Sequence, residues 1–419
     1  MQSLLILGRQ PHIGLAELES LYGATKIIPL SHGGALVDVD PCLLAFDRLG
    51  GSIKFCKVLA KLDYAGWDKI EDYLINQSPL HATAMPEGKM YLGVSAYNFD
   101  INPKTVFKTA VKIKQAIRAK TGRGVRVIPN VSLDLSSAQV IHNRLTLTNG
   151  WELVIFKDKQ STIIAQTVKV QNITAYARRD QARPFRDSKI GMLPPKLAQI
   201  IINLASGPLP PEAALSVCDI PPDQSIPKNY FVGSLLLDPF CGSGVIIQEA
   251  MIMGYNCLGS DINPRMIDYT KRNIDWLRNQ PKSPLPPAAT LQLEVADATN
   301  HNWEGRLSMI ASETYLGRPL SKAPVQSSDI RQQIEECNRI VKQFLENLAP
   351  QINSKTRLCI GVPSWQLADG SFYHLPVLDS LETIGYNRLS FQHSGADDQL
   401  IYFRKNQIVA RELLVLIRK

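Results

Sequence analysis

Residues 235–244, with the sequence LLLDPFCGSG, constrain the fold of this chain more than any other segment. Three aliphatic residues predict a buried strand that Asp238 closes, and a Gly-x-Gly turn leads directly into an apolar helix expected over residues 245–253. Glycine lets a backbone turn tightly and lets a ligand approach it closely. A strand, a glycine turn and a helix in this order are typical of the ligand-binding corner of an α/β sheet.

The turn favours a cationic ligand over a phosphate. Ile247 stands where a dinucleotide motif has its third glycine, and no Gly-Lys-Ser/Thr follows, so the segment is neither a dinucleotide fingerprint nor a P-loop. Asp238 would repel a pyrophosphate but would hold an ammonium group. S-adenosylmethionine (SAM) has an ammonium group and no phosphate, so it fits this corner.

Two further acidic residues close the next two expected strands. Asp261 follows residues 255–260 and is placed to accept both hydroxyls of a ribose. Asp297 follows a strand expected over residues 291–295 and could accept an adenine amino group. One acid at a strand end is usually only a helix cap, but three in succession favour a cofactor site. The expected cofactor-binding residues are Asp238, Cys241, Gly242, Gly244, Asp261, Ile262, Asp297 and Ala298.

Four segments carry a resemblance to a known family. Residues 238–244 resemble motif I of the RNA and DNA amino-methyltransferases. Together with residues 5–19, residues 180–198 and the closing residues 400–419, they make the chain similar to the THUMP-domain tRNA guanosine-10 N2-methyltransferases. The segments span nearly the whole chain. The sequences PPKLA at 194–198 and DPFCG at 238–242 are the most specific parts of the match.

The resemblance implies an α/β fold and an order of domains. It places a Rossmann-like, seven-stranded SAM-dependent methyltransferase domain over residues 191–419. Before it come an α+β domain of ferredoxin-like type over residues 1–65, a THUMP RNA-binding domain over residues 66–168 and a linker over residues 169–190. The implied reaction is SAM-dependent methylation of the exocyclic N2 amine of a guanosine in tRNA, in the cytoplasm.

The expected catalytic segment departs from the family pattern. Amino-methyltransferases have Asp/Asn-Pro-Pro-Tyr after the fourth strand, whereas residues 309–317 here read MIASETYLG. Glu313 falls where the acid is expected, both prolines are missing, and Tyr315 stands one place early. The lone pair of a guanine amine is delocalised into the ring, so the enzyme must accept hydrogen bonds from it and clamp the base. Glu313 is the expected acceptor and Tyr315 the expected stacking platform, an interaction worth roughly 1–3 kcal/mol.

Positive charge is concentrated in one part of the chain. Residues 101–200 contain 18 Lys and Arg against 5 Asp and Glu, a surplus of 13, whereas the whole chain carries +8. A basic block beside a neutral or acidic half indicates a module that binds a polyanion. A helix expected over residues 103–121 places three lysines on one face. The expected RNA-binding residues are Lys104, Lys108, Lys112, Arg123, Arg126 and Arg179.

Composition narrows the class of protein further. An apolar content of 45% and a charged content of 20% are typical of a globular chain, and 419 residues predict more than one domain. No apolar run is long enough to span a membrane. The seven cysteines are expected to be buried free thiols in a reducing compartment, and no metal site is expected. We expect a monomer without an accessory subunit.

The remaining pattern predicts elements around this site. Helices are expected over residues 15–22, 42–50, 196–204 and 329–348, and the third of them should cover the cofactor pocket. Residues 207–229 hold six prolines and are expected to form a surface excursion. A closing hairpin is expected at residues 400–403 and 412–417. Alternating β and α elements that end in an antiparallel hairpin suit a seven-stranded methyltransferase sheet.

Two other functions remain open at this point. The first is a ribosomal-RNA or DNA amino-methyltransferase with the same catalytic half, although a DNA enzyme would normally carry a target-recognition segment beside its sheet. The second is a tRNA-binding protein with a degenerate SAM-binding site, which the altered residues 313–317 favour. A methyltransferase for small metabolites is disfavoured, because it would not need the basic amino-terminal half.

Overall fold

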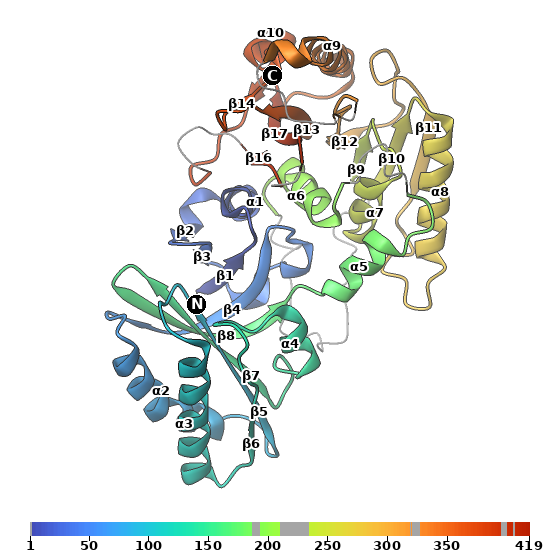
Figure 1. Ribbon diagram of the computed structural model, residues 1–419. Coiled ribbons are helices and arrows are strands. Elements are labelled where there is room, and N and C mark those ends of the chain that lie inside the picture. Colours follow the sequence, from blue (N-terminus) through green and yellow to red (C-terminus); the bar gives the residue numbers. More distant parts are fainter. Residues whose placement is uncertain are drawn as a thin grey trace.

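The computed structural model describes residues 2–186, 193–209, 234–318, 320, 327–394, 400–404 and 407–419. Figure 1 shows two lobes, each built around one β-sheet with helices packed against it. The amino-terminal lobe fills the lower half of the view and the carboxyl-terminal lobe the upper half. The expected mixture of α and β structure is therefore confirmed.

An eight-stranded sheet forms the centre of the amino-terminal lobe, in the order β2-β3-β1-β4-β8-β7-β5-β6. Its strands are β1 (Ser3–Leu7), β2 (Ile27–Leu30), β3 (Gly34–Val37), β4 (Ser52–Leu62), β5 (Met90–Tyr97), β6 (Val125–Val127), β7 (Gly150–Asp158) and β8 (Ser161–Val170). Because β4 pairs with β8, one sheet runs across the boundary expected near residue 65. The division of this lobe into two domains stays a prediction.

The helices of this lobe are α1 (Pro11–Tyr22), η1 (Ala24–Lys26), α2 (Trp67–Thr83), α3 (Pro103–Thr121) and α4 (Ser137–His142). The expected basic helix, α3, begins after Asn102, whose side chain accepts a hydrogen bond from the backbone NH of Lys104. It ends at Gly122, which adopts a left-handed conformation. Its apolar face packs into the lobe, and α3 lies beside α2 (Figure 1), so its lysine-rich face points outward.

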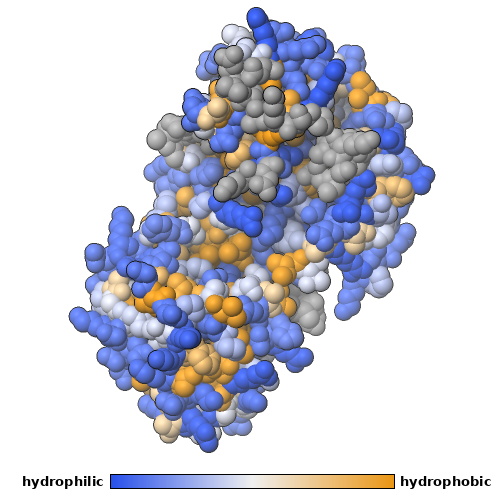
Figure 2. All heavy atoms as spheres, viewed as in Figure 1, coloured by the Kyte–Doolittle hydropathy of each residue, from blue (hydrophilic) through white to orange (hydrophobic). Residues whose placement is uncertain are grey.

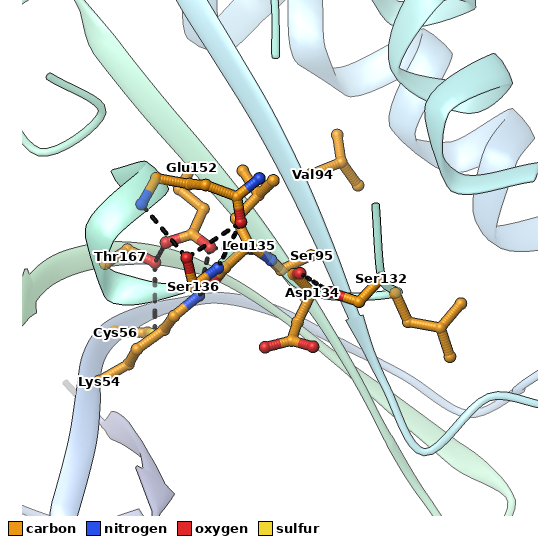
Figure 3. Close-up of polar contacts among 12 residues, drawn as sticks. Lys54, Cys56, Val94, Ser95, Ser132, Asp134, Leu135, Ser136, Glu152 and Thr167 are labelled. Atoms are coloured by element: carbon orange, nitrogen blue, oxygen red, sulfur yellow. Dashed lines mark hydrogen bonds and ion pairs between the residues drawn. The ribbon is translucent and has the colours of Figure 1, made fainter. Parts of the chain in front are cut away.

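A buried ion pair ties the strands of this sheet together (Figure 3). The Lys54 ammonium donates to Glu152 Oε1 at 2.5 Å, and neither side chain is more than 1% exposed. Ser95 donates to the same oxygen and Thr167 to Oε2 at 2.6 Å. The ammonium also donates to the carbonyl of Leu135 at 2.7 Å. Four strands and one loop thus meet at a carboxylate whose two oxygens are both occupied.

Two expectations for the first 190 residues are corrected, one of them in secondary structure. Residues 42–50 form no α-helix but the short 3-10 turns η2 (Pro41–Leu43) and η3 (Phe46–Arg48). The buried residues Leu44, Phe46 and Leu49 do not recur at helical spacing, so no helix could bury all three on one face. The expected linker contains a helix, α5 (Ile173–Gln181), which the side chain of Asn172 caps.

The second correction concerns the expectation that every cysteine is a free thiol, which is wrong for Cys42 because it is disulfide-bonded. The other cysteines in the described part of the chain are buried free thiols, namely Cys56, Cys241, Cys257, Cys337 and Cys359. Cysteine number and spacing carry no information about which side chains the fold brings together, so the sequence could not single out Cys42.

A second sheet forms the carboxyl-terminal lobe. Its main path has the order β11-β10-β9-β12-β13-β17-β15, while β14 pairs with β13 and β16 with β17. The strands are β9 (Leu235–Asp238), β10 (Asn256–Asp261), β11 (Leu291–Val295), β12 (Leu307–Glu313), β13 (Arg357–Gln366), β14 (Phe372–Tyr373), β15 (Tyr386–Arg388), β16 (Ile401–Tyr402) and β17 (Val409–Arg418). Strands β9 to β13 are parallel, and β17 is antiparallel to β13, β15 and β16, which confirms the expected closing hairpin.

Helices cover both faces of this sheet. They are α6 (Pro195–Ser206), α7 (Val245–Ile252), α8 (Pro264–Arg278), η6 (Ser327–Ile330), α9 (Arg331–Leu348), η7 (Ala349–Gln351), η8 (Pro376–Ser380) and α10 (Leu381–Ile384). Two large apolar clusters, one on each face, hold them in place. Contrary to expectation, α6 does not cover the candidate pocket, because it packs among α1, α7 and β13. The surface excursion expected over residues 207–229 lies mostly outside the described residues.

The two lobes meet at a buried polar network between α1 and α6. Glu17 accepts hydrogen bonds from the backbone NH groups of Gly50 and Gly51, each at 2.9 Å, and from the amide of Asn203 at 2.7 Å. Arg48 donates to Asn203 at 2.7 Å. Desolvation raises the pKa of Glu17 to about 7. A network this specific fixes how one lobe sits on the other.

The space-filling view in Figure 2 shows a mostly hydrophilic face with a waist between the lobes, and apolar side chains gathered over the strands of the lower lobe. Within the described residues, no helix is both long and apolar enough to cross a membrane.

Candidate active site

A cavity of about 610 Å³ opens at the carboxyl ends of the parallel strands β9, β10 and β12. This volume lies in the range of small-molecule sites, and the edge is where open α/β sheets bind ligands. The cavity wall contains nine of the residues expected from the sequence, namely Asp238, Cys241, Gly242, Asp261, Ile262, Asp297, Ala298, Glu313 and Tyr315.

The glycine turn brings the start of α7 close to the cavity. Gly242 and Gly244 have φ angles of 51° and 84°, which side-chain-bearing residues rarely adopt. Gly244, the tenth expected residue, does not line the cavity. A Cβ there would lie 2.7 Å from the side chain of Thr270 on α8, so this glycine lets the two helices approach. Thr270 in turn donates to the carbonyl of Gly242 at 2.8 Å and fixes the turn.

Asp238 presents a nearly dry carboxylate to the cavity. The residue is 1% exposed, and its Oδ1 accepts a hydrogen bond from Ser312 at 2.6 Å. Desolvation raises the pKa of Asp238 to about 7, and the neighbouring Asp261 and Glu313 contribute in the same direction. A cationic ligand would remove much of this penalty, so the site is suited to an ammonium group.

Asp261 is held by the turn that it faces. Its carboxylate accepts from the backbone NH of Gly242 at 3.0 Å and from that of Asn263 at 2.8 Å. Burial raises the pKa of Asp261 above its ordinary value. Each oxygen retains a free lone pair in ordinary carboxylate geometry, which is what a pair of ribose hydroxyls requires.

Asp297 has a more local set of contacts. Its Oδ1 accepts from the backbone NH and the hydroxyl of Thr299 at 2.9 and 2.7 Å, in a turn that follows β11. This is the capping arrangement expected of a single acid at a strand end. The same residue also lines the cavity, so the turn orients the carboxylate without removing it from the site.

An apolar wall faces these carboxylates. Ile262 is 69% exposed although it lies at the cavity, and Met266, Ala296 and Ala298 lie nearby in the wall. Large apolar side chains so exposed at a cavity are normally covered by a ligand. Carboxylates next to an apolar wall match a nucleoside with a flat base and ribose hydroxyls.

Glu313 lies at the end of β12, where a reacting group would meet the ligand. Its Oε1 accepts from Arg411 Nε at 2.5 Å, and the Arg411 side chain is only 5% exposed. Tyr315 follows in the cavity wall and packs against the apolar cluster around α9. The structure thus brings both expected catalytic residues to the same cavity as the expected cofactor residues.

Sequence reasoning missed several residues of this cavity. Arg318, Glu336 and Arg339 line its outer part, and they come from the loop after β12 and from α9. Arg411 was also missed, although a signal existed. Strand β17 has an apolar run beside the adjacent charges Arg411 and Glu412, and charged residues are rarely buried in such a strand unless they have partners.

The expected RNA-binding residues fall into two groups. Lys104, Lys108 and Arg126 are exposed on α3 and β6, and Lys112 on α3 is exposed but pairs with Glu71. Figure 1 places α3 at the far end of the molecule from β12, so this surface and the cavity are well separated.

Arg123 and Arg179 both donate hydrogen bonds to other parts of the chain. Arg123 donates to backbone carbonyls between Ala82 and Gly88, including that of Ala82 at 2.7 Å. Arg179 donates to the buried carboxylate of Glu249 at 2.8 and 3.2 Å and stacks over Tyr176. Both guanidinium groups therefore hold segments of the chain together, and neither belongs to the exposed basic surface.

No group of three or more His, Cys, Asp and Glu side chains within the described ranges could hold a metal ion. The charged groups in the cavity wall are its carboxylates and its arginines, and hydroxyl and amide side chains lie beside them.

Comparison with known proteins gives partial matches. Residues 106–272, less than half of the chain, match a family model described as a DNA methylase. A curated tRNA (guanine(10)-N2)-dimethyltransferase from Methanothermobacter thermautotrophicus is 22% identical over 188 residues, which cover 44% of each chain. A "probable tRNA (guanine(10)-N2)-dimethyltransferase" from Methanothermococcus thermolithotrophicus is 45% identical over 42 residues, which cover 10% of this chain and 26% of the relative.

The chain thus spans less than half the length of these curated relatives in the matched regions. Among solved structures, TrmN from Thermus thermophilus is 14% identical, with a TM-score of 0.49 and 100% of both chains covered.

Proposed function

We propose that this protein is a SAM-dependent methyltransferase that modifies the exocyclic N2 amine of a guanosine in tRNA. One observation carries the proposal: Asp238, Asp261, Asp297 and Glu313, from the ends of four strands, face a single cavity with a glycine turn and an apolar wall. The curated relatives support the substrate, since both are named as tRNA guanine-N2 dimethyltransferases.

The cavity residues fit SAM group by group. Asp238 would hold the ammonium group, Asp261 the ribose hydroxyls and Asp297 the adenine amine, while Ile262 would cover the base. When bound, SAM supplies a methyl group on a sulfonium, which is already a reactive electrophile. The work left to the protein is therefore to bring the target amine into line with that methyl group.

Glu313 and Tyr315 would position the target. A guanine buried in a helix must leave its stack to reach the cavity, as bases do in other base-modifying enzymes. Tyr315 would stack on it, and Glu313 Oε2 would accept a hydrogen bond from its amine. As the N–C bond forms and the C–S bond breaks, with its electron pair passing to sulfur, the nitrogen becomes positive. Glu313 is placed to stabilise that charge and to take the proton that the nitrogen then loses.

The amino-terminal lobe would bind the rest of the tRNA as a THUMP-type module. Lys104, Lys108 and Arg126 are exposed, and contacts from lysine and arginine to phosphates are strong but independent of sequence. The distance between α3 and the cavity in Figure 1 suits an extended polyanion that touches both lobes. Binding of this kind positions the RNA, while the cavity selects the base.

A second candidate is a tRNA-binding protein that keeps SAM as a structural ligand. The ion pair between Glu313 and Arg411 favours it, because a carboxylate committed to a buried arginine can serve structure alone. The two candidates differ in whether a methyl group is transferred from SAM to the RNA.

The deciding experiment is incubation of the purified protein with methyl-labelled SAM and unmodified tRNA, followed by digestion and identification of the labelled nucleoside by mass. N2-methylguanosine is the expected product. Label in another nucleoside would overturn the target. Absence of label, with SAM and tRNA binding retained, would overturn the enzyme and favour the binding protein.

A further inference from the structure

Strand β17, the last strand of the chain in the described residues, supplies the partner of the proposed catalytic carboxylate. Arg411 lies on β17, almost a hundred residues after Glu313, and donates from Nε to Glu313 Oε1 at 2.5 Å. The arginine side chain is 5% exposed and that of the glutamate 15%. This is a charged pair that is nearly closed to solvent on the arginine side and open to the cavity on the glutamate side.

The register of the strands explains how the two side chains meet. Glu313 pairs with Gly361 of β13, which pairs with Leu413 of β17, and Arg411 lies two residues before Leu413. These positions share one face of the sheet, since paired residues and residues two apart point to the same side. Arg411 itself pairs with Pro363 of β13, and its guanidinium reaches across that strand to the carboxylate.

A neighbouring ion pair on the same strand has a different environment. Glu412 is fully buried on the opposite face and accepts from Arg388 at 3.0 Å and from His374. None of these three residues lines the cavity. Two adjacent residues of β17 therefore take part in two ion pairs, of which only one reaches the candidate site.

We infer that Arg411 is the positioning residue of the methyl-transfer site and that it fixes Glu313 so that one carboxylate oxygen faces the target amine. The inference rests on the proposed function. Arg411 occupies Oε1, leaving Oε2 to accept from the amine. A carboxylate can accept a hydrogen bond from an amine in either rotamer, but only a fixed one holds the amine in line with the methyl group.

The same pair accounts for the departure from the family pattern. A prolyl-prolyl segment restricts the backbone after the acid, because proline fixes φ. Here both prolines are absent, and Glu313 has one more rotatable bond than Asp or Asn. A buried bond from a planar guanidinium restrains that longer side chain from the other end. The missing backbone restraint is thus replaced by a side-chain restraint from β17.

The first test replaces Arg411 by Met, which keeps much of the apolar stem. We expect kcat for tRNA methylation to fall about 10²-fold, the size of a misplacement of about 1 Å. The dissociation constant of S-adenosylhomocysteine and the KM for tRNA should stay within about twofold, because Arg411 touches neither ligand. Arg411→Lys, which keeps the charge, should recover part of the loss.

Arg388→Met is the matched control, since it breaks the adjacent ion pair of β17 without touching the cavity. We expect it to lower the melting temperature and to leave kcat unchanged at a temperature where it is folded. If Arg388→Met and Arg411→Met lose kcat equally, Arg411 acts only through the stability of the strand, and the inference is overturned.

A double substitution tests whether Arg411 works through Glu313. In a Glu313→Gln background, Arg411→Met should cost less than about twofold further in kcat, because the group that it positions is already gone. Multiplied losses would overturn the inference. A wild-type protein that transfers no methyl group would contradict the proposed function, whereas an active wild type with an unaffected Arg411→Met variant would contradict only the inference.

Discussion

Two glutamates that form ion pairs, one in each lobe, have opposite surroundings. Glu152 is fully buried, and its two oxygens accept from Lys54, Ser95 and Thr167 (Figure 3). Glu313 has an arginine on one oxygen and a cavity before the other. A carboxylate that is fully buried among donors of its own sheet can only hold strands together. A carboxylate with one side restrained and the other open can also act on a ligand.

This contrast shows that an ion pair in a protein core does not by itself indicate a function. Buried pairs add little net stability, yet they are costly to break on one side. What distinguishes Glu313 from Glu152 is the cavity beside it, which also receives the carboxylates of Asp238 and Asp261. Substitution of a carboxylate that faces the cavity should therefore change ligand binding and catalysis. Substitution within a fully buried ion pair should change the stability of the fold.

The largest effect should follow the loss of the open glutamate. Glu313→Ala should lower kcat for methyl transfer about 10³-fold, because proton acceptors in active sites typically contribute about 10² to 10⁴. Binding of SAM, measured by calorimetry, should be within about twofold of the wild type. Full transfer by this variant would remove Glu313 from the mechanism.

Breaking the buried ion pair between Lys54 and Glu152 should lower the stability of the fold instead. Lys54→Met leaves Glu152 buried without its cation, which should cost about 3–5 kcal/mol of unfolding free energy in urea titrations. Lys61→Met, an exposed position on the same strand, should cost less than about 0.5 kcal/mol. If Lys54→Met is as stable as the wild type but loses methyl transfer, the division between closed and open carboxylates fails.

Replacing Asp261, the proposed acceptor of the ribose hydroxyls, should weaken the binding of SAM. Asp261→Ala loses hydrogen bonds to a charged group, worth about 1.5–3 kcal/mol, so the dissociation constant of SAM should rise about 10- to 150-fold. Asp275→Ala, an exposed position on α8 outside the cavity, is the control and should leave affinity unchanged. Equal affinities for Asp261→Ala and the wild type would undo the cofactor assignment.

The pH dependence of SAM binding should report on Asp238. Its pKa in the empty cavity is raised to about 7, and an ammonium group binds the ionised carboxylate. Below pH 7 a proton must leave before the ligand binds, so affinity should fall up to about tenfold from pH 8 to pH 6 and level off above pH 8.

Asp238→Asn provides the comparison for this limb. Its affinity should be weaker at every pH and should vary less between pH 6 and pH 8. If the affinity of the wild type does not change between pH 6 and pH 8, Asp238 is already ionised before the ligand binds.

The smallest effect is expected far from both glutamates. Lys104→Glu and Lys108→Glu together should weaken tRNA binding at low salt. They should also reduce the slope of log K against log salt by about 1 for each phosphate that the protein no longer neutralises. Lys282→Glu, exposed in the other lobe, should change neither quantity. An unchanged slope in the double variant would place the RNA on another surface.

The predictable part of this molecule is the part that depends on local sequence. The strand, turn and helix around Gly242 were predicted because glycine, an apolar run and a closing acid determine each other over about ten residues. Helix α3 was predicted over residues 103–121, and in the structure Asn102 caps its start and the left-handed Gly122 ends it.

The unpredicted part depends on contacts between distant residues. The bond between Arg411 and Glu313 requires three strands to pair in one register, which no local pattern encodes. Arg179 was expected on RNA because its charge is visible in the sequence, while its buried partner Glu249 is not. The 3-10 turns near Phe46 were mistaken for a helix, although their buried residues Leu44, Phe46 and Leu49 lack the spacing of one helical face.

A structure with S-adenosylhomocysteine and a guanosine-containing RNA fragment would show whether the carboxylates at the four strand ends bind SAM and a guanine. We expect the ligand's ammonium group on Asp238, its ribose on Asp261 and the guanine N2 about 3 Å from Glu313 Oε2, with Arg411 still on Oε1. A guanine bound away from Glu313, or a ligand whose ammonium group and ribose meet other residues, would rule out this assignment.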